Sequence, residues 1–187
     1  MIMKRMIYLL LAVFLIQTTT AQVTVTNLRC EMLVNPLGIE AKQPRLSWQI
    51  NSNHRNVVQT SYQLIVSSTP GNLLLNKGDV WNSGTVKSSQ SIQVQYTGPA
   101  LKPATHYYWK VLVTTNKGSA TTLQSAFFST GLTADNWKAK WIGYDKGSVW
   151  DSITQWSRLS ARYLRKEFVS KPVVKRAMVY LSGLGMY

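Results

Sequence analysis

Carboxylates are the side chains best suited to acid–base chemistry in this sequence, and they are scarce. The 187 residues contain seven Asp and Glu. The aspartates fall in predicted turns or linkers, where Asp commonly hydrogen-bonds its own backbone, and the glutamates stand singly at or near predicted strands: Asp79, Asp135, Asp145, Asp151, Glu31, Glu40 and Glu167. We therefore expect none of them to supply a catalytic pair of carboxyl groups.

Nucleophilic and metal chemistry have equally few candidates. Cys30 is the single cysteine, so it has no partner for an internal disulfide, and with His54 and His106 it falls short of the four ligands of a structural zinc site. Neither histidine has a nucleophile at a motif spacing, so we expect both to be solvated. Gly183-Leu184-Gly185 opens no helix and indicates a turn rather than a dinucleotide site. We predict no catalytic, cofactor-binding or metal-binding residue in this sequence, and we expect no cofactor.

The charge balance bears on possible partners. The formal net charge is +14, yet charged residues make up only 15% of the chain, so acids are scarce rather than bases abundant. Ten of the 21 Lys and Arg lie between Lys138 and Arg176, which could suggest nucleic acid. Because they are spread singly along predicted strands, an acidic glycan or a solvated face is favoured, and no nucleic-acid partner is expected. Trp150 and Trp156 could stack on sugar rings or pack against other parts of the protein.

The N-terminus has the pattern of an export signal. Lys4 and Arg5 precede an apolar run from Met6 to Ile16, and Thr19-Thr20-Ala21 offers small residues for cleavage. Eleven apolar residues are too few to span a bilayer, which needs about 20, although a buried helix is the alternative. We predict a signal peptide over 1–21 and a mature chain that is exported, periplasmic or extracellular, without a membrane span.

The elements that position these side chains are predicted to be strands. Polar and apolar residues alternate in Leu46–Ile50, Tyr62–Val66 and Ile92–Tyr96, as in half-buried strands. Turn signals such as Asn35-Pro36, Thr69-Pro70-Gly71-Asn72 and Asn116-Lys117-Gly118 separate them. Residues 22–131 therefore predict an all-β domain, an immunoglobulin or fibronectin type III-like β-sandwich.

A tyrosine corner sharpens this prediction. In Leu101-Lys102-Pro103-Ala104-Thr105-His106-Tyr107, Pro103 fixes the bend and the Tyr107 hydroxyl can bond a backbone group a few residues upstream. Tyr107 and Trp109 then share the inner face of one strand, with Trp48 as their partner from the other sheet. We expect Trp48, Tyr62, Tyr107 and Trp109 to be buried.

The pattern changes after residue 131. Trp137, Ala139 and Trp141 alternate in a predicted linker strand within a linker over 132–160. Tyr163–Val169 and Val173–Leu181 are predicted strands. They would begin a second β-sandwich over 161–187, and two strands cannot bury a sheet face. We therefore expect the second domain to be incomplete in this chain.

An ordered set of motifs resembles one enzyme family. Leu28-Arg29-Cys30-Glu31, Pro44-Arg45-Leu46-Ser47-Trp48, Gln59-Thr60-Ser61-Tyr62-Gln63, Asp79-Val80-Trp81-Asn82-Ser83-Gly84 and Trp137-Lys138-Ala139-Lys140-Trp141-Ile142-Gly143 resemble the N-terminal part of bacterial α-L-rhamnosidases of glycoside hydrolase family 78. Tyr107-Tyr108-Trp109, Leu164-Arg165-Lys166-Glu167-Phe168 and Ser182-Gly183-Leu184-Gly185 continue the resemblance in order.

The resemblance implies a non-catalytic role for this stretch. In that family, a second β-sandwich and an (α/α)₆ barrel follow, and the barrel supplies both carboxyl groups for inverting hydrolysis of terminal α-L-rhamnose. The resemblance therefore implies rhamnose-containing glycans as partners of the missing domains and an inactive isolated chain, and it leaves the oligomeric state unknown. The alternative is a secreted fibronectin-like carbohydrate-binding or adhesion module with no enzyme attached.

Overall fold

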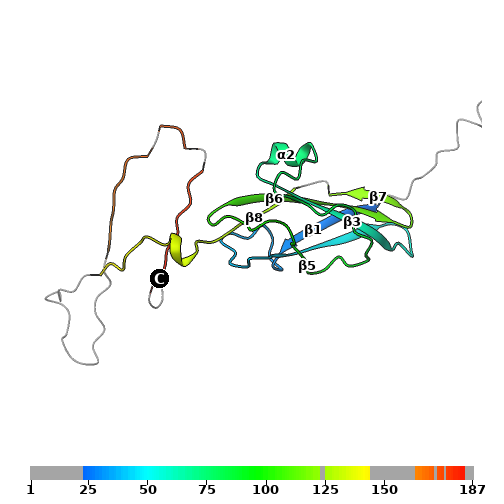
Figure 1. The fold of residues 1–187 in the computed structure, drawn as a ribbon, viewed down its shortest axis with the longest axis horizontal. Coiled ribbons are helices and arrows are strands. Elements are labelled where there is room, and N and C mark those ends of the chain that lie inside the picture. The colour runs from blue at the N-terminus through cyan, green and yellow to red at the C-terminus, as the bar shows by residue number, and fades with distance from the viewer. Residues whose placement is uncertain (1–22, 123–124, 144–162, 171, 175, 184–187) are drawn as a thin grey trace, which may run out of the picture. The chain divides into compact units, whose positions relative to one another are not determined.

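Two antiparallel sheets face each other in the N-terminal part of the molecule (Figure 1). The computed structural model describes residues 23–122, 125–143, 163–170, 172–174 and 176–183. One sheet has the order β1-β2-β5, and the other has the order β4-β3-β6-β7 with β8 also paired to β6. The strands are β1 Val23–Cys30, β2 Arg45–Ser52, β3 Gln59–Ser67, β4 Trp81–Asn82, β5 Val94–Gln95, β6 His106–Thr115, β7 Gly118–Thr121 and β8 Ala126–Ser129.

The strands predicted from alternation are present. Leu46–Ile50 lies within β2 and Tyr62–Val66 within β3. β6 alternates strictly between buried and half-buried positions over residues 106–113, so Tyr107, Trp109, Val111 and Val113 all face inward. The predicted turn at Asn116-Lys117-Gly118 joins β6 to β7 as a hairpin. The β-sandwich is therefore confirmed.

The core lies between the two sheets and is built from large side chains. Trp48, Tyr62, Tyr107 and Trp109 are all buried, as predicted. Trp48 of β2 meets Tyr62 of β3 edge to face across the sheets, with ring centroids 5.2 Å apart. Such pairs add stabilisation beyond the burial of apolar area, so this contact joins the two layers directly.

Two local predictions differ from the structure. The strand predicted over Ile92–Tyr96 is reduced to Val94–Gln95; Val94 and Tyr96 are buried, but Ile92 is 63% exposed. The turn signal at residues 69–72 forms a short helix, α2 Pro70–Leu74, where Thr69 caps the Asn72 N–H and Pro70 suits the first turn. Leu73 is buried, and α2 lies against β3 and β6 (Figure 1).

The tyrosine corner forms as expected. The Tyr107 ring is buried, and its hydroxyl accepts a hydrogen bond from the Lys102 backbone N–H at 2.8 Å. This bond spans five residues and closes the bend that Pro103 begins. The corner therefore sets the angle at which β6 enters the sandwich.

Replacing Tyr107 with phenylalanine is expected to cost about 1 to 2 kcal/mol, because the Lys102 N–H loses its partner while the ring still fills the core. Urea melts of the chain and of Tyr107→Phe measure the difference. Tyr163→Phe is the matched control, since Tyr163 is 98% exposed and its loss of a hydroxyl should leave the midpoint unchanged. Equal midpoints for all three proteins would contradict the role of the corner.

The chain divides into two compact units after Lys138, and the predicted strands of the second unit are absent from its described residues. Residues 163–170, 172–174 and 176–183 contain no assigned strand, because none of them has a hydrogen-bonded neighbouring strand there. The strands expected at Tyr163–Val169 and Val173–Leu181 are therefore not seen in the described residues, and the second β-sandwich over 161–187 stays a prediction.

The predicted linker strand at residues 137–143 is also absent. A single 3₁₀ turn, η1 Ala134–Asn136, comes first, and the following residues pair with no described strand. Trp137 and Trp141 are 39% and 69% exposed rather than packed. Within the described ranges, no helix has the length and apolar character needed to cross a membrane.

Candidate functional site

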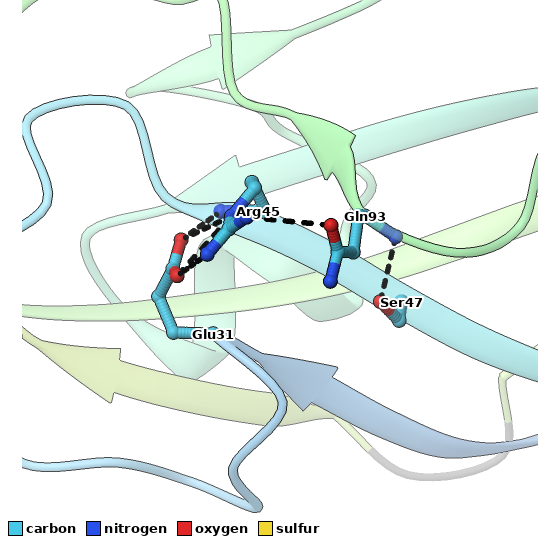
Figure 2. Close-up of polar contacts among 4 residues, drawn as sticks. All are labelled: Glu31, Arg45, Ser47 and Gln93. Carbon is cyan, nitrogen blue, oxygen red and sulfur yellow. Dashed lines mark hydrogen bonds and ion pairs between the residues drawn. The ribbon is translucent and has the colours of Figure 1, made fainter.

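The most organised polar cluster of the described residues centres on Glu31 and Arg45 (Figure 2). Glu31 follows the end of β1, and Arg45 opens β2 beside it. Arg45 Nη2 donates to Glu31 Oε2 at 2.7 Å, and the Arg45 backbone N–H donates to Glu31 Oε1 at 2.7 Å. Arg45 Nη1 also donates to Gln93 Oε1 at 3.3 Å, and the Gln93 N–H donates to Ser47 Oγ at 2.8 Å. The cluster thus joins β1, β2 and the segment before β5.

Glu31 sits in a strained turn. Glu31 and Met32 both have positive φ, +49° and +64°, as in a type I′ turn, which usually takes Gly, Asn or Asp. Cys30 and Leu33 close the turn through two backbone hydrogen bonds of 2.9 and 3.0 Å. Arg29 Nη1 donates to the Met32 carbonyl at 3.0 Å. The hydrogen bonds to Glu31 and Met32 therefore hold a backbone conformation that these residue types disfavour.

This arrangement makes Glu31 a structural carboxylate. The side-chain hydrogen bond from Arg45 lowers the pKa of Glu31, and burial only partly opposes that effect. The carboxylate is consequently ionised at neutral pH and its oxygens are occupied by Arg45 donors. A general acid would need the opposite, a raised pKa and access to substrate.

The Glu31→Gln change is expected to lower the melting temperature at pH 7. Because folding lowers the pKa of Glu31, its stabilising contribution is present above the unfolded-state pKa and is lost as the pH falls through the folded-state value. The difference in melting temperature between the original chain and Glu31→Gln should therefore shrink between about pH 5 and pH 3. Exposed Glu40 offers the control Glu40→Gln, and a difference independent of pH would contradict the ion pair.

The other described carboxylates are dispersed. Asp79 is exposed and accepts from the Ser68 N–H and hydroxyl; burial raises its pKa, but these hydrogen bonds outweigh it and the pKa is lowered. Glu167 pairs with Arg165, two residues away. Glu40 and Asp135 are exposed. Within the described ranges, no three His, Cys, Asp or Glu residues come together as metal ligands would.

The histidines have different environments. His54 is exposed, as expected. His106 is half-buried rather than solvated, which corrects the prediction. Its ring stacks on Phe127 with centroids 4.5 Å apart and lies against Tyr108 at 4.8 Å, because the pairing of β6 with β8 places these side chains on one outer face.

Sequence reasoning gave no role to Gln59, which the structure buries. Trp48 Nε1 donates to Gln59 Oε1 at 3.0 Å, and Gln59 Nε2 donates to the carbonyls of Ser88 and Gln90 at 2.9 and 2.8 Å. Both ends of the amide are therefore satisfied, and the loop before β5 is attached to the core. Gln59 had appeared only in the motif Gln59-Thr60-Ser61-Tyr62-Gln63, three residues before the predicted strand Tyr62–Val66. Arg45 was likewise seen only as part of a motif.

Several predicted features lie outside the described residues. They are the signal peptide with its cleavage position at Ala21, most of the linker over 132–160 with Asp145, Asp151, Trp150 and Trp156, and Leu184 and Gly185 of the terminal glycine motif.

Known proteins similar to this chain are described as alpha-L-rhamnosidases. An alpha-L-rhamnosidase from Formosa agariphila is 34% identical over 201 aligned residues, which is 96% of this chain and 21% of that protein. An alpha-L-rhamnosidase from Streptomyces avermitilis is 42% identical over 120 residues, 63% of this chain and 12% of that protein. This chain thus spans about a fifth or less of these relatives.

A solved structure and a family match locate the similarity. The alpha-L-rhamnosidase from Dictyoglumus thermophilum matches with a TM-score of 0.61 and 39% identity over 64% of this chain and 14% of that one. Residues 25–134 match the family described as "Rha78A-like, N-terminal immunoglobulin domain". These residues include all of the sandwich except the first two residues of β1, together with the Glu31–Arg45 cluster and the tyrosine corner. This chain therefore belongs to the family of Rha78A-like N-terminal immunoglobulin domains.

Proposed function

We propose that this chain is the N-terminal, non-catalytic portion of an exported α-L-rhamnosidase that removes terminal α-L-rhamnose from rhamnosides with inversion. The observation that carries the proposal is the uneven coverage: the Formosa agariphila enzyme aligns with 96% of this chain, yet that alignment uses 21% of the enzyme. Most of such an enzyme would then lie outside this stretch. The pattern of residues 1–21 supports export.

The described carboxylates support the non-catalytic role. Inverting hydrolysis uses one carboxyl group as acid and another to activate water, with about 6.5 to 9.5 Å between them. Glu31 is bound by Arg45, and Asp79 by Ser68, so neither is free to exchange protons with a sugar. In the proposal the catalytic pair belongs to the later domains, and rhamnose-containing glycans are bound there.

The purified chain is therefore expected to release no product from an aryl α-L-rhamnoside. A longer protein, encoded by this sequence together with the coding sequence beyond Tyr187, should release it. Product release by the chain above a heat-inactivated control would contradict the proposal. Glu31→Gln, Glu40→Gln and Glu167→Gln would then test whether the activity depends on these carboxylates. A continuation that encodes only further sandwich domains would instead favour a binding or adhesion module.

A further inference from the structure

A groove lies on the outer face of the β1-β2-β5 sheet, and we name it the outer groove. It encloses about 490 Å³, within the range of about 300 to 1,000 Å³ that is typical of ligand-binding clefts. Because Trp48 of β2 is buried in the core, the alternating residues Gln49 and Asn51 point outward. The lining includes Arg29 of β1, Met32 of the following turn, Gln49 and Asn51 of β2, and Ser91 and Ile92 before β5.

A β-bulge brings Arg29 to this outer face. Thr26 pairs with Gln49 and Arg29 pairs with Ser47, so β1 has one more residue than β2 between these two pairs. In a regular strand, residues three positions apart point to opposite faces. The extra residue in the bulge therefore places Arg29 on the same face as Thr26, as bulges beside binding sites commonly do.

The Arg29 guanidinium is held in place and still has donors to offer. Its Nε donates to Asn27 Oδ1 at 3.0 Å, and its Nη1 donates to the Met32 carbonyl at 3.0 Å. A guanidinium has five N–H groups, and Nη2 has no hydrogen-bond partner among the described residues. Because two hydrogen bonds already orient the side chain, it loses little conformational entropy when it binds a ligand.

The other side chains of the outer groove suit a ligand that carries hydroxyl groups. The exposed Gln49 amide has no partner among the described residues, and Asn51 Nδ2 donates to Thr26 Oγ1 at 2.8 Å, which leaves Asn51 Oδ1 as an acceptor. An amide offers a donor and an acceptor together, as a sugar hydroxyl does. Met32 and Ile92 are 46% and 63% exposed and offer apolar contact to the C–H groups of a sugar ring.

The charges favour an anion in this groove. Its described lining contains one arginine and no Asp or Glu. Residues 23–131 contain nine Lys and Arg against three Asp and Glu, a net charge of +6, which attracts anions from a distance. The nearby Glu31 carboxylate is already bound by Arg45. Charge complementarity therefore points to an anionic group bound by Arg29.

We propose that the outer groove binds an acidic sugar residue of a glycan chain, with a carboxylate or sulfate group on Arg29 and sugar hydroxyls on Gln49 and Asn51. This rests on the proposed function, which makes glycans the ligands of the complete enzyme. The groove holds the glycan chain and takes no part in its cleavage. It is thus a second sugar site, separate from the one that the proposed function assigns to the later domains.

Titrations of the ¹⁵N-labelled chain followed by NMR test this site. The probes are methyl α-D-glucuronoside, which carries a carboxylate, and methyl α-D-glucoside 6-sulfate; neutral methyl α-D-glucoside is the control ligand. We expect at least one acidic sugar to bind in the millimolar range, at least fivefold more tightly than the neutral sugar, and added salt to weaken it. The tighter of the two acidic sugars identifies the anionic group.

Three variants locate the binding. Arg29→Gln should weaken the acidic sugar at least fivefold and change the affinity for the neutral sugar less than twofold. Arg55→Gln is the matched control, because exposed Arg55 lies outside the described lining and its replacement removes the same charge. Gln49→Ala, which leaves the hydrogen bonds of Arg29 in place, should weaken the acidic sugar at least threefold.

Other results overturn the proposal. Equal affinity for the acidic and neutral sugars, or no binding of either acidic sugar, removes the acidic-sugar site. Weakening by Arg55→Gln as large as that by Arg29→Gln would reduce the effect to net charge. Tighter binding of a single-stranded DNA oligonucleotide than of either acidic sugar would make nucleic acid the ligand. Rhamnoside hydrolysis by the longer protein is measured separately, so the proposed function can stand when this site fails.

Discussion

Replacing Trp109 with alanine is expected to lower the free energy of unfolding by about 3 to 5 kcal/mol. Trp109 is fully buried on β6, where its strand partners are Val66 of β3 and Ala126 of β8. Truncation removes a large apolar side chain from the middle of the core, and the two paired sheets cannot collapse freely into the space. Urea denaturation followed by far-ultraviolet circular dichroism measures the loss.

Two further variants keep this prediction testable. The Trp109 indole N–H has no hydrogen-bond partner among the described residues, so Trp109→Phe removes an unsatisfied donor and retains much of the ring. We expect Trp109→Phe to cost clearly less than Trp109→Ala. Trp141→Ala, at a residue 69% exposed, should change stability by less than about 0.5 kcal/mol. A loss below about 1 kcal/mol in Trp109→Ala would contradict the register of β6.

The Cys30 thiol is expected to react with Ellman's reagent at least about 10³-fold more slowly in the native chain than in the unfolded chain at pH 8. Burial, with a smaller contribution from the Glu31 carboxylate, raises the pKa of Cys30 to about 12. The thiolate is the reactive form, so the native protein contains very little of it, and the side chain is only 1% exposed.

The rate of this reaction then reports on opening of the sandwich. Because Cys30 is the single cysteine of the chain, the signal needs no assignment. Leu75→Cys in a Cys30→Ala background should label rapidly in the native state and serves as the positive control. Native labelling of Cys30 within tenfold of the unfolded rate would mean that the end of β1 is open to solvent.

The contacts of the Glu31 turn explain how two residues other than glycine keep a left-handed backbone conformation. Positive φ at Glu31 and Met32 is unfavourable for side chains with a Cβ. The Glu31 carboxylate and the Met32 carbonyl each receive arginine donors, which offset that cost. The turn is thereby held in one backbone conformation.

Local patterns were sufficient for the strands and the corner. Alternation over five residues predicted β2 and β3, because successive side chains of a strand point to opposite faces whatever the partner strand is. The bond from Lys102 to Tyr107 joins groups five residues apart, so the motif contains both partners. The family resemblance also follows from motifs read in order along the chain.

Contacts between distant residues depended on the tertiary structure. Glu31 meets Arg45 across 14 residues, Gln59 reaches the carbonyl of Gln90 across 31, and Asn35 meets Phe127 across 92. The register between strands decides which of these groups become neighbours, and local alternation does not encode that register. For the same reason, the sequence did not predict that His106 is half-buried, because the Phe127 ring that stacks on it belongs to β8.

The amino-acid sequence by itself thus determined the fold class, the buried aromatic face of β6 and the family, since each depends on residue type and near-neighbour spacing. Only the tertiary structure decided that Glu31 is a structural anion and that Gln59 is buried beside Trp48. Apolar alternation at 163–169 is not by itself enough to predict a strand in the described residues, because a strand forms only when a neighbouring strand accepts and donates its backbone hydrogen bonds.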